Sequence, residues 1–130
     1  MIQRVQTVYL AAASTLFAVA AILAFGGTDA LNTNDYVGIS IAGLLSVGLA
    51  ISVFLHGDRK KQARLVRSLR LAALLLTVLF GLLLVVEGPL DTLFAFLPLA
   101  LSLGGTLTVH LGARAIKRDI DLVKSMDRIR

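Results

Sequence analysis

The side chains that could do chemistry are few, and two of them are histidines at the ends of apolar runs. His56 and His110 are the two histidines of the 130-residue chain. Two histidines on different helices can ligate haem inside a helical bundle. A histidine at a helix C-terminus is also favoured by the helix dipole, without any ligand. The second interpretation is preferred, so no cofactor and no metal are expected.

A second candidate is a polar face on the last apolar run. Pro98, Ser102, Thr106 and His110 recur at helical spacing and would share one side of a helix. Such a face could line a groove for a small or lipidic solute, or it could pack against another helix. Helix packing is preferred, because proton- and ion-coupled transporters ordinarily place ionisable groups at membrane depth. The apolar runs 5–25, 36–55, 71–86 and 92–111 contain no Asp, Glu, Lys or Arg.

Composition excludes several other kinds of chemistry. The chain has no Cys, which excludes disulfides, thiolate zinc sites and thiol redox reactions. Hydrophobic residues make up 57% of the chain, above the 45–50% or so of a soluble domain. This hydrophobic content indicates a membrane protein, and with these kinds of chemistry excluded we expect that it is not an enzyme.

The elements that must position these residues are four transmembrane helices. A run of about twenty apolar residues spans the roughly 30 Å hydrocarbon core at 1.5 Å per residue. The third uncharged run is shorter, so its helix is expected to begin near Arg59. A cleaved signal peptide is the alternative for the first run, with Arg4 before it, but three further runs favour a span. The predicted fold is all-α, a single domain over residues 1–130 with spans at about 5–25, 36–55, 69–86 and 92–111.

Short polar segments separate the runs. Asp35, Asp58 and Asp91 are expected to N-cap the second, third and fourth helices, with Gly57 in the C′ position that ends the second. Pro98 is expected to kink the fourth helix.

The basic residues predict the orientation. All thirteen Lys and Arg lie at Arg4, in the basic segment 56–70, or in the tail 112–130. The two other connecting segments carry acidic residues and no base. Because Lys and Arg favour the cytoplasmic side, we expect two antiparallel hairpins in a bacterial inner membrane, with both termini cytoplasmic. Anionic headgroups are the expected partners of the basic segments. Nucleic acid is not expected, since base-stacking aromatic residues are missing among these charges.

Small residues predict where the helices pack. Stripes of small side chains let helix backbones approach closely in lipid. The second span carries one such stripe and the third another. The candidate packing residues are Gly38, Ala42, Ser46, Ala50, Ala73, Thr77 and Gly81.

The turn at 87–91 makes the third and fourth spans antiparallel neighbours, so their cytoplasmic extensions can pair. Reflection about this turn places Asp119 and Asp121 near residues 59–61, and Ile116 near Val66. In the alternative arrangement the helix breaks at Gly112 and the tail lies on the lipid surface.

Both ends of the chain resemble a known family. The start, MIQRVQTVYLAAA, and the tail, ARAIKRDIDLVKSMDRIR, resemble small four-span membrane proteins of Bacteroidetes-type bacteria that are grouped as a domain of unknown function. The resemblance implies four inner-membrane spans and no particular activity.

The matching polar residues suggest an interaction surface at the cytoplasmic face. We expect a non-enzymatic scaffold or accessory subunit that acts through helix packing and this basic face. A protein partner or a second copy of the chain would bind there. The alternative is a homo-oligomeric transporter or channel for a small or lipidic solute, and a haem- or quinone-associated anchor is the weakest option. The candidate surface residues are Gln3, Arg4, Gln6, Tyr9, Arg114, Asp119, Asp127 and Arg128.

Overall fold

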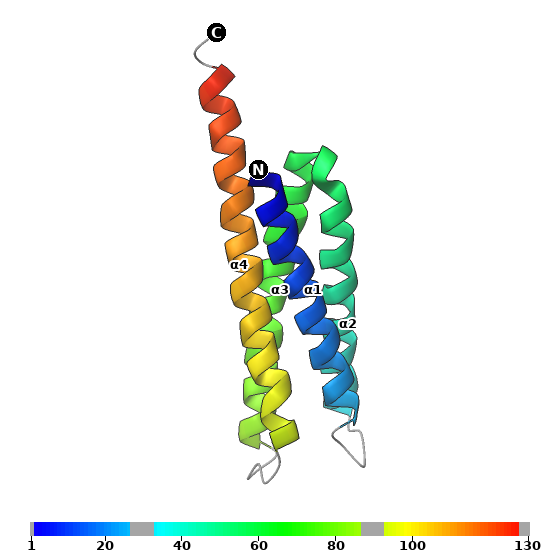
Figure 1. The fold of residues 1–130 in the computed structure, drawn as a ribbon. Coiled ribbons are helices and arrows are strands. Elements are labelled where there is room, and N and C mark those ends of the chain that lie inside the picture. Colours follow the sequence, from blue (N-terminus) through cyan, green and yellow to red (C-terminus); the bar gives the residue numbers. More distant parts are fainter. Residues whose placement is uncertain (1, 27–32, 87–92, 128–130) are drawn as a thin grey trace.

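The apolar runs form four long α-helices in the computed structural model of the chain (Figure 1). The structure describes residues 2–26, 33–86 and 93–127, apart from the side chains of residues 2–4, 26, 33–35, 56, 93–95 and 127. The helices are α1 (Ile2–Gly26), α2 (Thr33–Phe54), α3 (Arg59–Val86) and α4 (Leu93–Asp127), and the 3₁₀ turn η1 (Leu55–Gly57) joins α2 to α3.

All four helices are long and apolar enough to cross a membrane. A helix satisfies its backbone hydrogen bonds internally, which is what a hydrocarbon solvent requires. Many large apolar side chains also point outward, among them Leu44, Leu75 and Val85, which are 72%, 71% and 81% exposed. An apolar exterior of this extent indicates a membrane protein.

The helices form a ring in which each contacts its neighbours in the chain and α4 closes the ring against α1. Consecutive helices run in opposite directions, and the end of α4 projects beyond the rest (Figure 1). The interior holds large side chains such as Phe17, Leu49 and Leu76, each at most 1% exposed.

Glycines set the closest approaches between helices. A Cβ atom on Gly105 of α4 would lie 2.8 Å from the ring of Phe17 on α1. A Cβ on Gly48 of α2 would lie 2.9 Å from Leu69 on α3. Gly43 faces open space. Only some of the small residues therefore contact another helix closely.

The packing stripes from the sequence lie largely at these contacts. Ala42 and Ala73 are fully buried, and a Cβ on Gly38 would lie 3.0 Å from Phe80. Ala50 and Gly81 are half-buried, and the nearest atom to a Cβ on Gly81 is 4.0 Å away.

Short hydroxyl side chains complete these contacts. The Ser14 hydroxyl donates to the Ser46 carbonyl oxygen at 2.9 Å, which joins α1 to α2. The Thr77 and Thr106 hydroxyls lie 3.0 Å apart, which joins α3 to α4. Ser46 and Thr77, both in the predicted stripes, thus carry polar contacts between helices.

Two local expectations, at Gly57 and Asp35, need revision. Gly57 lies in η1 and does not adopt the left-handed conformation of a C′ glycine. The 3₁₀ turn closes the end of α2 instead, with the Asp58 amide donating to the Leu55 carbonyl at 3.0 Å.

α2 begins at Thr33, so Asp35 lies in its first turn rather than at its N-cap. α4 continues through Pro98 as an unbroken helix, and the expected cap at Asp91 lies outside the described residues.

Candidate functional site

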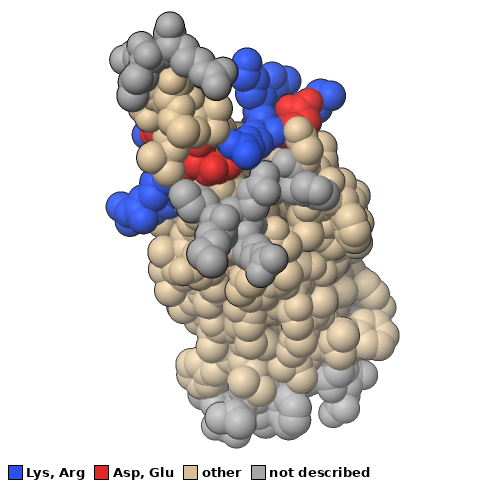
Figure 2. Space-filling model, turned by 45° about the horizontal axis from the view of Figure 1, so that its top comes forward, with Lys and Arg blue, Asp and Glu red and all other residues tan. Residues whose placement is uncertain are grey.

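Charged side chains gather at one end of the molecule. Figure 2 shows Lys, Arg and Asp side chains at the end that carries both chain termini, while the described residues below them in this view are uncharged. We call this region the charged end: residues 55–70, residues 113–126 and the first two turns of α1.

The lengths of α3 and α4 create this end. Their 28 and 35 residues correspond to about 42 and 52 Å at 1.5 Å per residue. Both exceed the roughly 30 Å hydrocarbon core. The excess length carries the charged residues, and the helices stay packed there through Val66 and Ile116, which are at most 2% exposed. α4 runs unbroken through Gly112, without the break that the surface-lying alternative requires.

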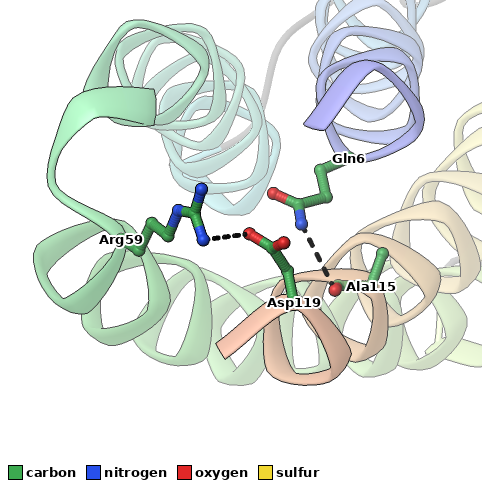
Figure 3. A network of polar contacts seen from close by, with 4 residues as sticks. All are labelled: Gln6, Arg59, Ala115 and Asp119. Carbon is green, nitrogen blue, oxygen red and sulfur yellow. Dashed lines mark hydrogen bonds and ion pairs between the residues drawn. The ribbon is translucent and has the colours of Figure 1, made fainter. Parts of the chain in front are cut away.

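An ion pair joins the two extensions. Arg59 Nη1 lies 3.1 Å from Asp119 Oδ2, with side-chain exposures of 36% and 12% (Figure 3). This is the pairing expected from reflection about the turn at 87–91. Asp121 forms no ion pair with the other described side chains.

The same region of α4 is tied to α1. Gln6 is 4% exposed, and its side-chain amide donates to the Ala115 carbonyl oxygen at 3.3 Å (Figure 3). A second glutamine, Gln62 of α3, is 2% exposed and donates to the Ser52 carbonyl oxygen of α2 at 2.9 Å. Long polar side chains thus cross three of the helix interfaces at the charged end.

Asp58 caps α3. Its carboxylate accepts a hydrogen bond from the Lys61 amide at 3.2 Å, the N-cap geometry expected from the sequence. The Lys61 ammonium lies 3.1 Å from the other carboxylate oxygen. The Lys61 backbone hydrogen bond, the Lys61 side chain and the Lys60 amide together hold the pKa of Asp58 below its usual value, against an opposing effect of desolvation.

Two grooves open on the surface of the charged end. The larger, about 430 Å³, lies between α3 and α4 and we call it the α3–α4 groove. Val66 and Ile116 contribute to its apolar floor. Its basic side chains are Arg67, Arg70, Arg114, Lys117 and Lys124.

The smaller groove, about 340 Å³, lies between α1 and α4 and we call it the α1–α4 groove. Tyr9, Leu111 and Leu122 supply apolar surface, while Arg114 and Arg118 supply positive charge. Both grooves can accept an amphipathic anion, because each sets cationic groups beside apolar side chains.

The candidate surface residues divide into two groups in the structure. Gln6 and Asp119 are buried in contacts between helices, whereas Tyr9 and Arg114 line the α1–α4 groove. The side chains of Gln3, Arg4, Asp127 and Arg128 lie outside the described residues.

The α3–α4 groove is also lined by residues that were not among the candidate surface residues, although they belong to the basic segments expected to contact anionic headgroups. Arg67 on α3 and Lys117 on α4 are both exposed and both line it. Gln62 was missed as well, although an uncharged polar residue inside a basic run is a signal for an interhelical contact.

The polar face on α4 is occupied by packing. Ser102 is fully buried and donates to the Leu99 carbonyl at 2.8 Å. Thr106 contacts Thr77 and also donates to the Ala73 carbonyl at 3.3 Å. His110 is exposed, and the side chain of His56 lies outside the described residues. Among the described side chains, no cluster of three or more potential metal ligands is found.

Comparison with curated proteins gives no match, and comparison with solved structures gives none either. One family model does match, over residues 23–129. The match includes the basic segment 56–70 and nearly all of the tail, while the N-terminal motif lies outside it. By this match over most of its length, the chain belongs to the family described as a domain of unknown function, DUF4293.

Proposed function

We propose that the protein is a non-enzymatic scaffold or accessory subunit of a bacterial inner membrane. It crosses the membrane four times as two antiparallel hairpins, with both termini and the charged end in the cytoplasm. The observation that carries the proposal is the separation of roles along α3 and α4. In the apolar parts of these helices, the polar side chains are used up in contacts inside the bundle. The charged extensions of the same helices carry the two grooves and their basic side chains.

The orientation follows from the distribution of Lys and Arg. The ten Lys and Arg residues with described side chains lie in α3 before Leu71 or in α4 after Gly112. Positive residues flanking short loops are retained on the cytoplasmic side. The contacts of α1 with α2 and of α3 with α4 support the pairing into two hairpins (Figure 1).

Because the chain has no Cys, single introduced cysteines can test this orientation. Ser125→Cys, on the exposed end of α4, should react with a membrane-impermeant maleimide only after the inner membrane is opened. Thr28→Cys, in the segment between α1 and α2, should react in intact spheroplasts. The reverse pattern would overturn the proposed topology.

The α1–α4 groove is the proposed docking surface for a protein partner. Its arginines and Tyr9 suit a segment with acidic and apolar side chains, because a desolvated arginine and an aromatic ring are typical anchors of protein interfaces. Truncation after Gly112 is a poor test, since it would also remove Ile116 and Asp119 from the bundle. A point replacement of exposed Arg118 leaves those contacts in place.

The test is photo-cross-linking in living cells, with a photoreactive residue in place of Arg118. The matched control replaces Arg64, which is exposed at the charged end and lines neither groove. We expect one recurrent protein adduct from position 118, absent from position 64, and the same hetero-complex in native mass spectrometry. A symmetric oligomer of this chain alone, with no adduct, would support the transporter instead.

A transporter has less support from the geometry. The α4 face proposed for its solute is the face on which Ser102 and Thr106 are buried and hydrogen-bonded. A solute would have to displace the hydrogen bonds of Thr106 to α3 and the packing around the buried Ser102.

A further inference from the structure

The α3–α4 groove is lined by basic side chains that take no part in the ion pairs that stabilise the fold. Its five basic side chains face one acid, Asp121. Within the described part of the chain, none of these six side chains forms an ion pair. The basic charge that stabilises the fold is elsewhere, at Arg59 with Asp119 and at Lys61 with Asp58.

The floor of the groove is apolar. Ala63, Ala113 and Ile120 are half-buried and supply the exposed apolar surface of this floor, while Val66 and Ile116 beneath them are almost fully buried. A small hydrated anion would gain nothing from this floor. An anion that also carries hydrocarbon would cover it, because burial of apolar surface is favourable in water.

The groove also leads toward the apolar part of the bundle. Leu74 and Val78 follow Arg70 at steps of four residues on α3, so they continue the same face, and they are 48% and 59% exposed. Arg70 is thus the last basic residue before a lipid-facing apolar row. A molecule with a charged head in the groove could lay its chain along this row.

We infer that the α3–α4 groove is a discrete binding site for one anionic phospholipid, with its phosphate between Arg67 and Lys117 and its acyl chain along Leu74 and Val78. Basic pockets between helices on the cytoplasmic side suit anionic headgroups. The inference rests on the proposed topology, which puts the groove at the level of the inner leaflet. It does not depend on any protein partner.

The test uses the purified full-length protein in a mild detergent and native mass spectrometry. Phosphatidylglycerol is titrated against phosphatidylethanolamine, which is zwitterionic. We expect a single phosphatidylglycerol adduct that saturates, and no saturable adduct with phosphatidylethanolamine. Equal binding of the two lipids would overturn the inference.

Charge-matched variants locate the site. Arg67→Gln with Lys117→Gln removes one cation from each wall of the groove. Lys60→Gln with Arg64→Gln removes two exposed cations that line neither groove. We expect the first pair to weaken phosphatidylglycerol binding roughly thirtyfold and the second less than threefold. Equal weakening by both pairs would show that the lipid responds to diffuse charge and would refute a discrete site.

Soluble competitors distinguish a lipid from a free phosphate compound. Inorganic phosphate and glycerol 3-phosphate carry the charge of the headgroup without its hydrocarbon. Neither should displace the lipid at millimolar concentration, and displacement by either would overturn the assignment to a lipid. Unchanged unfolding temperatures for both variant pairs would show that the bundle is intact. Loss of the lipid site alone would leave the scaffold proposal standing, and an absent protein partner would leave the lipid site standing.

Discussion

The two parts of the bundle are held together by different kinds of contact. In the apolar part, helices meet through glycine, alanine and short hydroxyls, as at Gly105 against Phe17 and Ser14 against Ser46. At the charged end, longer side chains reach across the interfaces, as in the Arg59–Asp119 ion pair.

The solvent explains the difference. Lipid tails are as apolar as the side chains, so burial in a membrane adds little driving force and close packing must hold the helices together. In the proposed topology the charged end lies outside the hydrocarbon core, where water reaches the helices, so burial of apolar groups such as Ile116 stabilises them directly. The same substitution should therefore have a different cost in the two parts of the molecule.

The prediction with the largest expected effect compares the same kind of truncation in the two parts of the molecule. Ile116→Ala should destabilise the bundle by about 3 kcal/mol, because it loses both the transfer free energy and the packing of a buried side chain. Leu76→Ala, at an equally buried position in the apolar part, should cost about half as much, because the transfer term largely disappears in lipid. Unfolding in lipid–detergent mixtures, followed by circular dichroism, measures both. Equal costs would contradict the proposed difference in driving force.

The next effect concerns close packing in the apolar part. Gly105→Leu places side-chain atoms where Phe17 already lies, so α1 and α4 must separate. The expected destabilisation is about 1–3 kcal/mol, typical of overpacking. Gly43→Leu is the matched control, since nothing lies within 4 Å of a Cβ there. The same unfolding assay should find the control as stable as the natural protein or more so, and a comparable loss at both positions would refute tight α1–α4 packing.

Which glycines are tightly packed could not be read from the sequence. Apolar residues surround each span on all sides, so hydrophobic periodicity does not separate the lipid-facing side from the interior. Gly43 and Gly105 therefore look alike until the helices are placed.

At the charged end the sequence is more informative. Charge and apolar residues alternate there with helical spacing, and the short turn at 87–91 sets which positions face each other. The Arg59–Asp119 pair and the start of α3 at Arg59 were predictable for this reason. The grooves were not, because they depend on how α1 and α3 flank α4.

A smaller effect concerns the Arg59–Asp119 pair itself. The two side chains remain partly exposed, so water screens their attraction. A double-mutant cycle with Arg59→Gln and Asp119→Asn should give a coupling free energy of about 1 kcal/mol. The same cycle with Arg64→Gln in place of Arg59→Gln should give none. Coupling that is as large for Arg64 would mean that general charge, rather than this contact, joins the two extensions.

The smallest expected effect is a pH dependence at Asp58, the cap that begins α3 at the charged end. The pKa of this carboxyl is lowered in the folded protein, mainly by the Lys61 backbone hydrogen bond. A lowered folded pKa means that the unfolded chain binds the proton more readily. The stabilisation is therefore complete above the unfolded value of about 3.9, and it is lost as the pH falls through the lower folded value.

Asp58→Asn keeps a capping oxygen but removes the charge. Thermal unfolding should find the natural protein more stable than this variant between pH 5 and pH 7, with the difference shrinking below about pH 4. Asp121→Asn is the control, since its carboxylate makes no hydrogen bond or ion pair with the described residues. If the difference at Asp58 stayed constant at acidic pH, the cap would act through its shape alone. Charge would then contribute less to the stability of the charged end than its ion pairs suggest. The two parts of the bundle would differ mainly in their solvent, which is water at the charged end and lipid around the apolar part.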